Sequence, residues 1–226
     1  MAEKRKVARL IASAIGGPIR GKLGNLVLVA TPDGAIARTL TQPRNPRTPA
    51  QIAVRDRQTV CAQAWSDLDD EADRRWRAYA RRLETSDPRT GTWTQPRPDN
   101  LFGALYSRML LVDPRATPPQ VPPEGAFFGD AIGVVTSDGA SGVRFEAGGP
   151  NAAGVVTELL TQRLVTRKRR TYLEKYRHAA IVRFEEGHLG VEVPYAAGWV
   201  ACAYRFIRAD TGQATALAEI GVVRVD

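Results

Sequence analysis

The sequence predicts an α+β protein in which an N-terminal β-hairpin and a three-helix region precede an antiparallel β-sandwich of the immunoglobulin or fibronectin kind. Three observations lead to this class. Apolar residues recur at helical spacing between residues 49 and 110, a proline-rich stretch without periodicity follows, and alternating apolar segments separated by turn residues fill the rest. We therefore expect a helical domain with a basic tail, hairpin and extended arm at 1–111, a linker at 112–125 and a sandwich domain at 126–226.

A β-hairpin is expected near the start of the chain, where Leu26–Ala30 and Ala35–Leu40 are rich in apolar residues. Between them, Pro32 and Gly34 occupy the positions that a type I turn prefers. Two strands alone are only marginally stable in water. The hairpin must therefore lie on another surface, in its own chain or in a neighbour.

An arginine-rich arm leads from the hairpin into the first helix. Its prolines predict an extended connector at Gln42–Arg47. Thr48 then fits an N-cap and Pro49 the first helical position. Seven apolar residues fall within one arc of a helical wheel and predict the buried face of this helix: Ala53, Val54, Val60, Cys61, Ala64, Trp65 and Leu68.

Arg57 falls inside that apolar arc, whereas Arg55 falls outside it. A buried cation needs a carboxylate or carbonyl partner. We expect Arg57 to be buried and to have such a partner, either in another subunit or among the acidic residues Asp69, Asp70 and Asp73.

Two more helices are expected before the linker. The second runs from about Asp69 to Leu83, with acidic residues in its first turn and arginines in its last, as the helix dipole favours. The third follows Asp99, its expected N-cap, and carries an apolar stripe from Leu101 to Leu110. The aromatic residues of these helices predict a packed core rather than a cofactor site.

Seven short segments with a period of two residues predict the strands of the sandwich. They are Ile132–Thr136, Gly142–Ala147, Val155–Leu164, Tyr172–Phe184, Leu189–Val193, Trp199–Arg208 and Ala216–Val225. The basic run Thr166–Tyr172 interrupts this pattern and is expected to be a loop or a strand end.

The positive charge of the chain is concentrated in its first quarter. Residues 1–60 hold eleven Lys and Arg against three acidic residues, a net charge of +8, and the remaining residues are neutral in sum. Such a segment suggests nucleic acid, an anionic lipid surface or an acidic patch on another subunit as its partner, although it is also compatible with a solvated surface. The candidate subunit or nucleic-acid contacts are Lys22, Arg38, Arg44, Arg47, Arg55 and Arg57.

No motif in the sequence names a reaction. The two histidines have no partners at metal-ligand spacing, no serine lies in a nucleophile elbow, and no phosphate-binding loop occurs. Cys61 and Cys202 are expected to be buried apolar residues. We expect no enzymatic activity, no cofactor, no metal and no small-molecule substrate.

The segment Val7–Ile19 has a basic start and some apolar content, but it is too short and too interrupted by glycine and proline to span a membrane. Without a convincing secretion signal, we expect the protein in the host cytoplasm or in a virion, with no membrane partner.

The first 110 residues resemble a poorly characterised group of phage- and prophage-associated proteins. The shared residues are Gly21-Lys22-Leu23-Gly24, the run NPRTPAQIAVRDRQ at Asn45–Gln58, and the spaced residues Trp65, Leu68, Trp76, Tyr79 and Ala80. This chain departs from the simplest pattern in a longer loop at Glu84–Pro98. The resemblance implies a hairpin, helices and a β-rich tail, and it supplies no catalytic residues.

The sequence is compatible with three functions. The favoured one is a non-enzymatic structural component of a phage-like virion, whose hairpin and arm contact neighbouring copies or other virion proteins. The alternative is a nucleic-acid-associated protein that binds phosphates through its basic N-terminal region. A bacterial surface or filament subunit is disfavoured because no export signal is evident.

Overall fold

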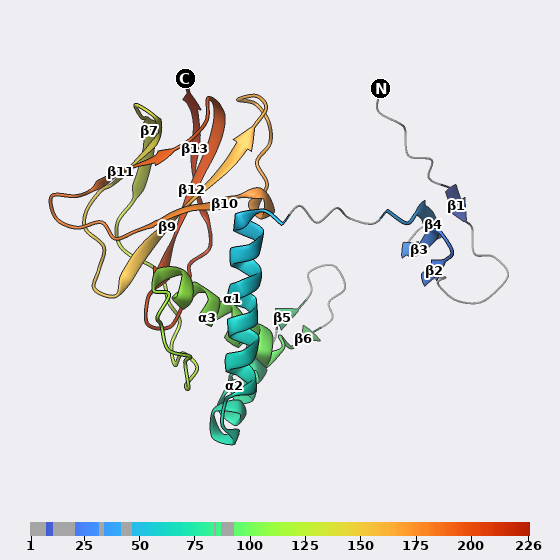
Figure 1. The fold of residues 1–226 in the computed structure, drawn as a ribbon. Helices are drawn as coiled ribbons and strands as arrows, with labels where there is room; N and C mark the ends of the chain where they lie inside the picture. The colour runs from blue at the N-terminus through green and yellow to red at the C-terminus, as the bar shows by residue number, and fades with distance from the viewer. Residues whose placement is uncertain (1–7, 11–20, 32–33, 42–46, 84, 87–92) are drawn as a thin grey trace. The chain divides into compact units, whose positions relative to one another are not determined.

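Figure 1 shows the fold of the chain in a computed structural model, which describes residues 8–10, 21–31, 34–41, 47–83, 85–86 and 93–226. The α+β class is confirmed, with helices in the middle of the chain and antiparallel sheets before and after them. The chain divides into two compact units, Met1–Thr48 and Pro49–Asp226. This division differs from the predicted one, which placed the boundary at 112–125.

The N-terminal unit is a four-stranded antiparallel sheet in the order β1-β4-β3-β2. The predicted hairpin is present as β3 and β4, and two three-residue strands join its edges. A two-residue turn links β2 to β3, with Gly24 at its first central position and a φ of 55°, which glycine tolerates best. The strands are β1 Ala8–Leu10, β2 Gly21–Leu23, β3 Leu26–Thr31 and β4 Gly34–Thr39. The predicted turn residues Pro32 and Asp33 lie outside the described residues.

Three helices open the second unit: α1 Pro49–Ser66, α2 Asp70–Arg82 and α3 Pro98–Val112. A short antiparallel pair, β5 Thr85–Ser86 and β6 Trp93–Thr94, lies between α2 and α3. As predicted, α1 begins at Pro49. Asp69 caps α2, and its carboxylate accepts a hydrogen bond of 2.7 Å from the backbone N–H of Ala72.

The predicted cap of the third helix is wrong. Arg97 holds the N-cap position and Pro98 the first turn, because proline is already suited to the start of a helix. Asp99 instead pairs with the Arg97 guanidinium at 2.7 Å. The helices pack through an aromatic cluster in which Trp76 and Phe102 are fully buried and their ring centroids lie 5.3 Å apart.

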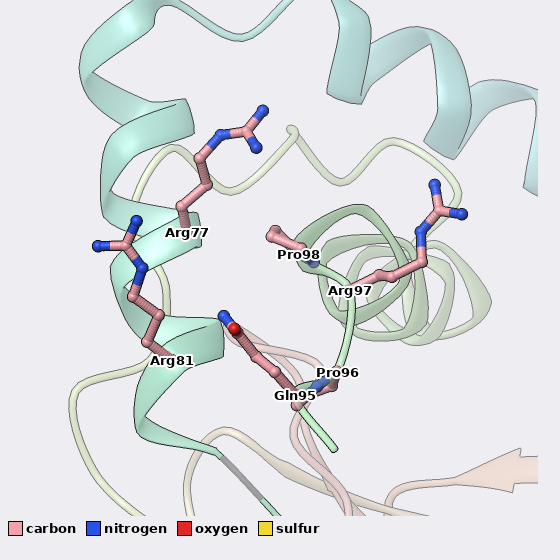
Figure 2. Close-up of a pocket in the computed structure, with 6 residues that line it drawn as sticks. All are labelled: Arg77, Arg81, Gln95, Pro96, Arg97 and Pro98. Carbon is pink, nitrogen blue, oxygen red and sulfur yellow. The ribbon is translucent and has the colours of Figure 1, made fainter. Parts of the chain in front are cut away.

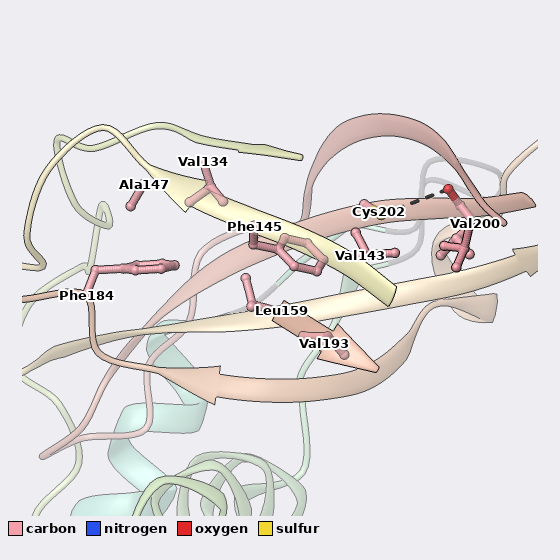
Figure 3. Close-up of a cluster of buried hydrophobic side chains, with 10 residues drawn as sticks. Val134, Val143, Phe145, Ala147, Leu159, Phe184, Val193, Val200 and Cys202 are labelled. Atoms are coloured by element: carbon pink, nitrogen blue, oxygen red, sulfur yellow. Dashed lines mark hydrogen bonds between the residues drawn. The ribbon is translucent and has the colours of Figure 1, made fainter. Parts of the chain in front are cut away.

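The last part of the chain forms two facing antiparallel sheets, in the orders β11-β8-β7 and β10-β9-β12-β13. Buried side chains from both sheets meet in one apolar cluster, which includes Phe145, Leu159, Phe184 and Val200 (Figure 3). The strands are β7 Val134–Asp138, β8 Gly142–Ala147, β9 Val155–Leu164, β10 Arg177–Val182, β11 Gly190–Pro194, β12 Gly198–Arg208 and β13 Ala218–Val225.

All seven predicted strands have a counterpart in the structure. The segment expected at Tyr172–Phe184 is shorter, because a 3₁₀ turn at Leu173–Lys175 delays its start to Arg177. Immunoglobulin constant domains place the fourth strand beside the fifth. Here the fourth strand of the sandwich, β10, pairs with the third, β9, whereas the fifth, β11, lies in the opposite sheet. The immunoglobulin or fibronectin likeness stays a prediction.

The stretch 112–125, which was expected to be a linker, lies inside the second compact unit and contacts the helices. Its residues pack back on the helices, since the backbone oxygens of Ala116 and Pro119 accept hydrogen bonds from Tyr106 and Trp76. At the other side of α3, Arg108 donates to the backbone oxygen of Gly212 at 3.1 Å.

At Gly212 the turn after β12 approaches the backbone of α3 very closely. A Cβ atom there would lie 2.0 Å from the backbone oxygen of Leu105, and the residue has a φ of 67°. We expect Gly212→Ala to lower the free energy of unfolding of Pro49–Asp226 by about 3 kcal/mol or more, from backbone strain and the clash together. Denaturant unfolding followed by circular dichroism measures this.

Gly154→Ala is the matched control, because Gly154 has a similar φ of 73° but nothing within 4 Å of its added Cβ. It should cost only the backbone strain, about 1 kcal/mol. Equal losses in the two variants would show that the packing of α3 on this turn contributes nothing to stability.

Candidate subunit interface

The N-terminal sheet gathers two of the predicted contact residues on one face. Lys22 on β2 lies opposite Val27 on β3, and Val27 lies opposite Arg38 on β4. Residues directly opposite in an antiparallel sheet share a face, so these three side chains form a row across the sheet. Both cations are exposed, and two strand spacings put them roughly 10 Å apart. We call this face the basic face.

The opposite face carries two leucines and Ala37, with the exposed Thr39 as its polar member. Apolar side chains are not confined to it, since Val29 and Ile36 lie on the basic face. Leu28 lies opposite Ala37, and Leu26 lies opposite Thr39. Leu26 is 42% exposed, and Ala37 is the one buried side chain among those described in this sheet. A sheet needs a covered apolar face for stability in water. The described residues of the unit do not supply that cover by themselves.

The other predicted contact residues lie along the arm and α1. Arg44 is outside the described residues. Arg47 is exposed and has a φ of 48°, so the chain turns here and the predicted extended arm does not continue to this residue. Arg55 lies on an exposed stretch of α1.

Arg57 is half-buried on α1, one turn before the buried Cys61. Its Nε atom is buried and, within the described residues, has no hydrogen-bond partner. Two of the three predicted partners are otherwise engaged, since Asp69 caps α2 and Asp73 pairs with Arg77 at 2.6 Å. Burial raises the pKa of the Cys61 thiol, and the nearby Arg57 charge lowers it in part.

The first half of α1 is largely uncovered. The predicted apolar arc packs only from Cys61 onward, where Cys61 is buried and Trp65 is half-buried against α3. Ile52, Val54 and Val60 are 44%, 49% and 47% exposed. Next to Val60, a groove of about 500 Å³ is lined by apolar atoms of Ala64, Tyr106 and Pro118. Polar residues, among them Gln63 and Asp67, also line this α1 groove. A hollow with exposed apolar atoms of this kind suits a protein partner.

Phe128 is a second uncovered apolar group in this unit, with 92% of its surface exposed. The chain on either side is fixed. Gly125 accepts a hydrogen bond of 2.7 Å from the Gln213 side chain, and a Cβ on Gly129 would lie within 3.0 Å of Phe206 and Thr215. Phe128 therefore projects from an anchored loop, as an interface anchor would.

Arginines line one further hollow, between α2 and the start of α3, but they do not form a convergent anion site. Figure 2 shows the guanidinium of Arg97 pointing away from those of Arg77 and Arg81. Arg77 and Arg97 are also paired with Asp73 and Asp99.

Glu158 is the buried ionised group of the sandwich, 2% exposed on β9. Its carboxylate accepts hydrogen bonds from Arg205 Nε at 2.5 Å and pairs with His178 Nδ1 at 3.1 Å. Burial alone would raise the pKa of Glu158, but the hydrogen bonds from His178 and Arg205 outweigh it and lower that pKa. With both oxygens engaged, this carboxylate is part of the structure rather than an available acid or base.

No group of three or more metal-ligating side chains occurs in the described ranges. None of the helices in that part of the chain combines the length and hydropathy needed to cross a bilayer. Comparison of the chain with protein-family models, with curated proteins and with solved structures gives no match.

Replacing Arg57 tests whether its partner lies on another subunit. Arg57→Leu removes a buried nitrogen that has no partner among the described residues, so the isolated chain should keep or raise its melting temperature. If a neighbouring copy supplies the partner, the same variant should lose assembly by light scattering. A melting temperature well below the wild-type value would instead mean that Arg57 is paired within its own chain.

Glu158→Gln tests the buried ion pair. It leaves Arg205 without its carboxylate, and we expect a loss of about 3 kcal/mol in the free energy of unfolding at neutral pH. Because the folded-state pKa of Glu158 is lowered, its contribution is present above the ordinary glutamate pKa and is lost as pH falls through the folded value. The gap between wild type and variant should therefore narrow on acidification, as measured by denaturant unfolding. A gap independent of pH would contradict this role.

Proposed function

We propose that this chain is a non-enzymatic structural subunit of a multi-subunit assembly, of the phage-virion kind that its N-terminal signature suggests. Its N-terminal sheet docks on a neighbouring copy. The observation that carries the proposal is the apolar face of this sheet, where Leu26 is 42% exposed and Leu28 is only partly buried. A sheet of this kind becomes stable when another surface covers it.

Charge complementarity supports a second copy as the occupant. Residues 1–48 hold nine Lys and Arg and two acidic residues, a net charge of +7. Residues 49–226 outside 163–177 hold 16 basic and 21 acidic residues, a net charge of −5. The second unit as a whole has a net charge of +1, so only its part outside 163–177 is complementary in charge to the first unit.

The second unit also offers apolar contact groups. Phe128 and the α1 groove are two such groups, and both differ from the N-terminal sheet. A contact between the sheet of one copy and either group on the next copy would join unlike surfaces and would therefore be head-to-tail. Head-to-tail contacts generate rings or filaments, which are the forms that structural subunits build.

The alternative, binding of nucleic acid through the N-terminal region, rests on the basic face. Lys22 and Arg38 flank Val27 in one exposed row, as phosphate contacts on a flat surface would. The two functions therefore use opposite faces of the same sheet.

Variants on the two faces separate these functions. Leu26→Ser with Leu28→Ser removes the apolar face, and we expect the assembled species to become monomeric in size-exclusion chromatography with light scattering. The thermal unfolding of Pro49–Asp226 should not change, because those residues form a separate unit.

Lys22→Ala with Arg38→Ala is the comparison on the other face. It should leave assembly intact if the structural role is correct. If the alternative is correct, it should flatten the dependence of log affinity for duplex DNA on log salt by about 2. A wild-type chain that stays monomeric at all concentrations would refute the structural proposal.

A further inference from the structure

A second concentration of positive charge lies between β9 and β10, far from the N-terminal unit in sequence. Residues 163–177 hold seven cations and one carboxylate, a net charge of +6, whereas the rest of Pro49–Asp226 has a net charge of −5. All seven cations are exposed: Arg163, Arg167, Lys168, Arg169, Arg170, Lys175 and Arg177. We call residues 163–177 the basic loop.

The basic loop is held in place by hydrogen bonds. The buried side chain of Gln162 accepts a hydrogen bond of 3.1 Å from the backbone N–H of Tyr172. Within the loop, the N–H of Arg169 donates to Thr166 at 3.1 Å and the N–H of Lys175 donates to Tyr172 at 2.9 Å. The cations are thus presented on an ordered backbone, which lowers the entropic cost of binding.

The aromatic rings beside these cations are already occupied by positive charge. Lys175 Nζ lies 4.3 Å from the centre of the Tyr172 ring, and Arg170 Cζ lies 5.6 Å from it. Arg224 lies over Trp199 at 5.9 Å. With cations over the rings, stacking of bases is not the contact this surface offers.

A hollow of about 530 Å³ lies at the strand end that leads into the loop, lined by Arg163, Val165 and Trp199. Five of the seven cations are arginines, whose forked guanidinium group matches the geometry of phosphate oxygens. We propose that the basic loop binds duplex nucleic acid through its phosphodiester backbone, without base recognition. This inference does not depend on the docking of the N-terminal sheet.

An anionic bilayer is the competing partner, because Val165 is 88% exposed and Leu173 is 63% exposed. Cations alone attract an anionic lipid surface, and a continuous apolar face beside them strengthens that binding by inserting into the bilayer. The two side chains lie at opposite ends of the loop in sequence and belong to no helix with such a face. Phosphates of nucleic acid therefore fit the loop better.

The test measures the affinity of the full chain for a short fluorescent DNA duplex of random sequence, by anisotropy between about 50 and 200 mM salt. Arg167→Ala/Lys168→Ala/Arg169→Ala removes three exposed cations of the loop. We expect weaker binding and a salt slope smaller in magnitude by about 2–3. The control Arg74→Ala/Arg82→Ala/Arg115→Ala removes the same charge from exposed positions elsewhere in Pro49–Asp226 and should keep the wild-type slope.

Three outcomes would overturn the proposal. Equal effects of both triple variants would mean that only net charge matters. Loss of binding with Lys22→Ala/Arg38→Ala alone would assign the DNA site to the N-terminal sheet. Binding to phosphatidylserine-containing vesicles that the loop variant abolishes, without binding to the duplex, would make the loop a lipid site. Circular dichroism of each variant checks that the fold is retained.

Discussion

The contact between α3 and the turn after β12 makes the helices and the sandwich one body. Arg108 donates to the backbone oxygen of Gly212, and the backbone of this turn approaches Leu105 so closely that only glycine fits. Because this contact fixes α3, it also fixes α1, which packs on α3 through Cys61 and Trp65. The uncovered turns of α1 and the α1 groove thus have a defined place on the unit.

The N-terminal sheet differs from the second unit in how it is stabilised. It has regular pairing between its strands, yet among its described side chains only Ala37 is buried. Its two described cations lie on one face, and Leu26 and Leu28 lie on the other. Regular backbone hydrogen bonding supplies the shape, and burial against a partner supplies the stability. The second unit, Pro49–Asp226, has its own buried core, whereas we expect the first unit, Met1–Thr48, to depend for its stability on contact with a partner.

The sequence predicted the strands and helices well, because alternation and helical periodicity are local signals. It could not predict which strands pair, so the extra strands β1 and β2 and the position of β10 beside β9 were not anticipated. The boundary at 112–125 was expected from prolines, but composition does not report that Trp76 and Tyr106 bind the backbone of that stretch. Of the site residues, Lys22 and Arg38 share a face of the sheet only because of the strand register, which the sequence pattern does not give.

Three further features could not be predicted fully from the sequence. Phe128 stands in a short loop between glycines, where nothing in the pattern separates an exposed aromatic residue from a buried one. The ion pair of Glu158 depends on Arg205, which is 47 residues away and becomes its neighbour only through the pairing of β9 with β12. Arg57 is half-buried where burial was expected, and two of its three expected partners, Asp69 and Asp73, make other contacts.

The reactivity of the two cysteines can report how often the packed parts of the chain open. Cys61 lies among the helices and Cys202 between the sheets, both buried, and burial raises the pKa of Cys202 to about 12. Alkylating reagents attack the thiolate, so neither sulfur reacts while its surroundings are closed. The rate at which each thiol is modified reports how often its own cluster opens. The native chain thereby carries one reporter for the helices and another for the sandwich.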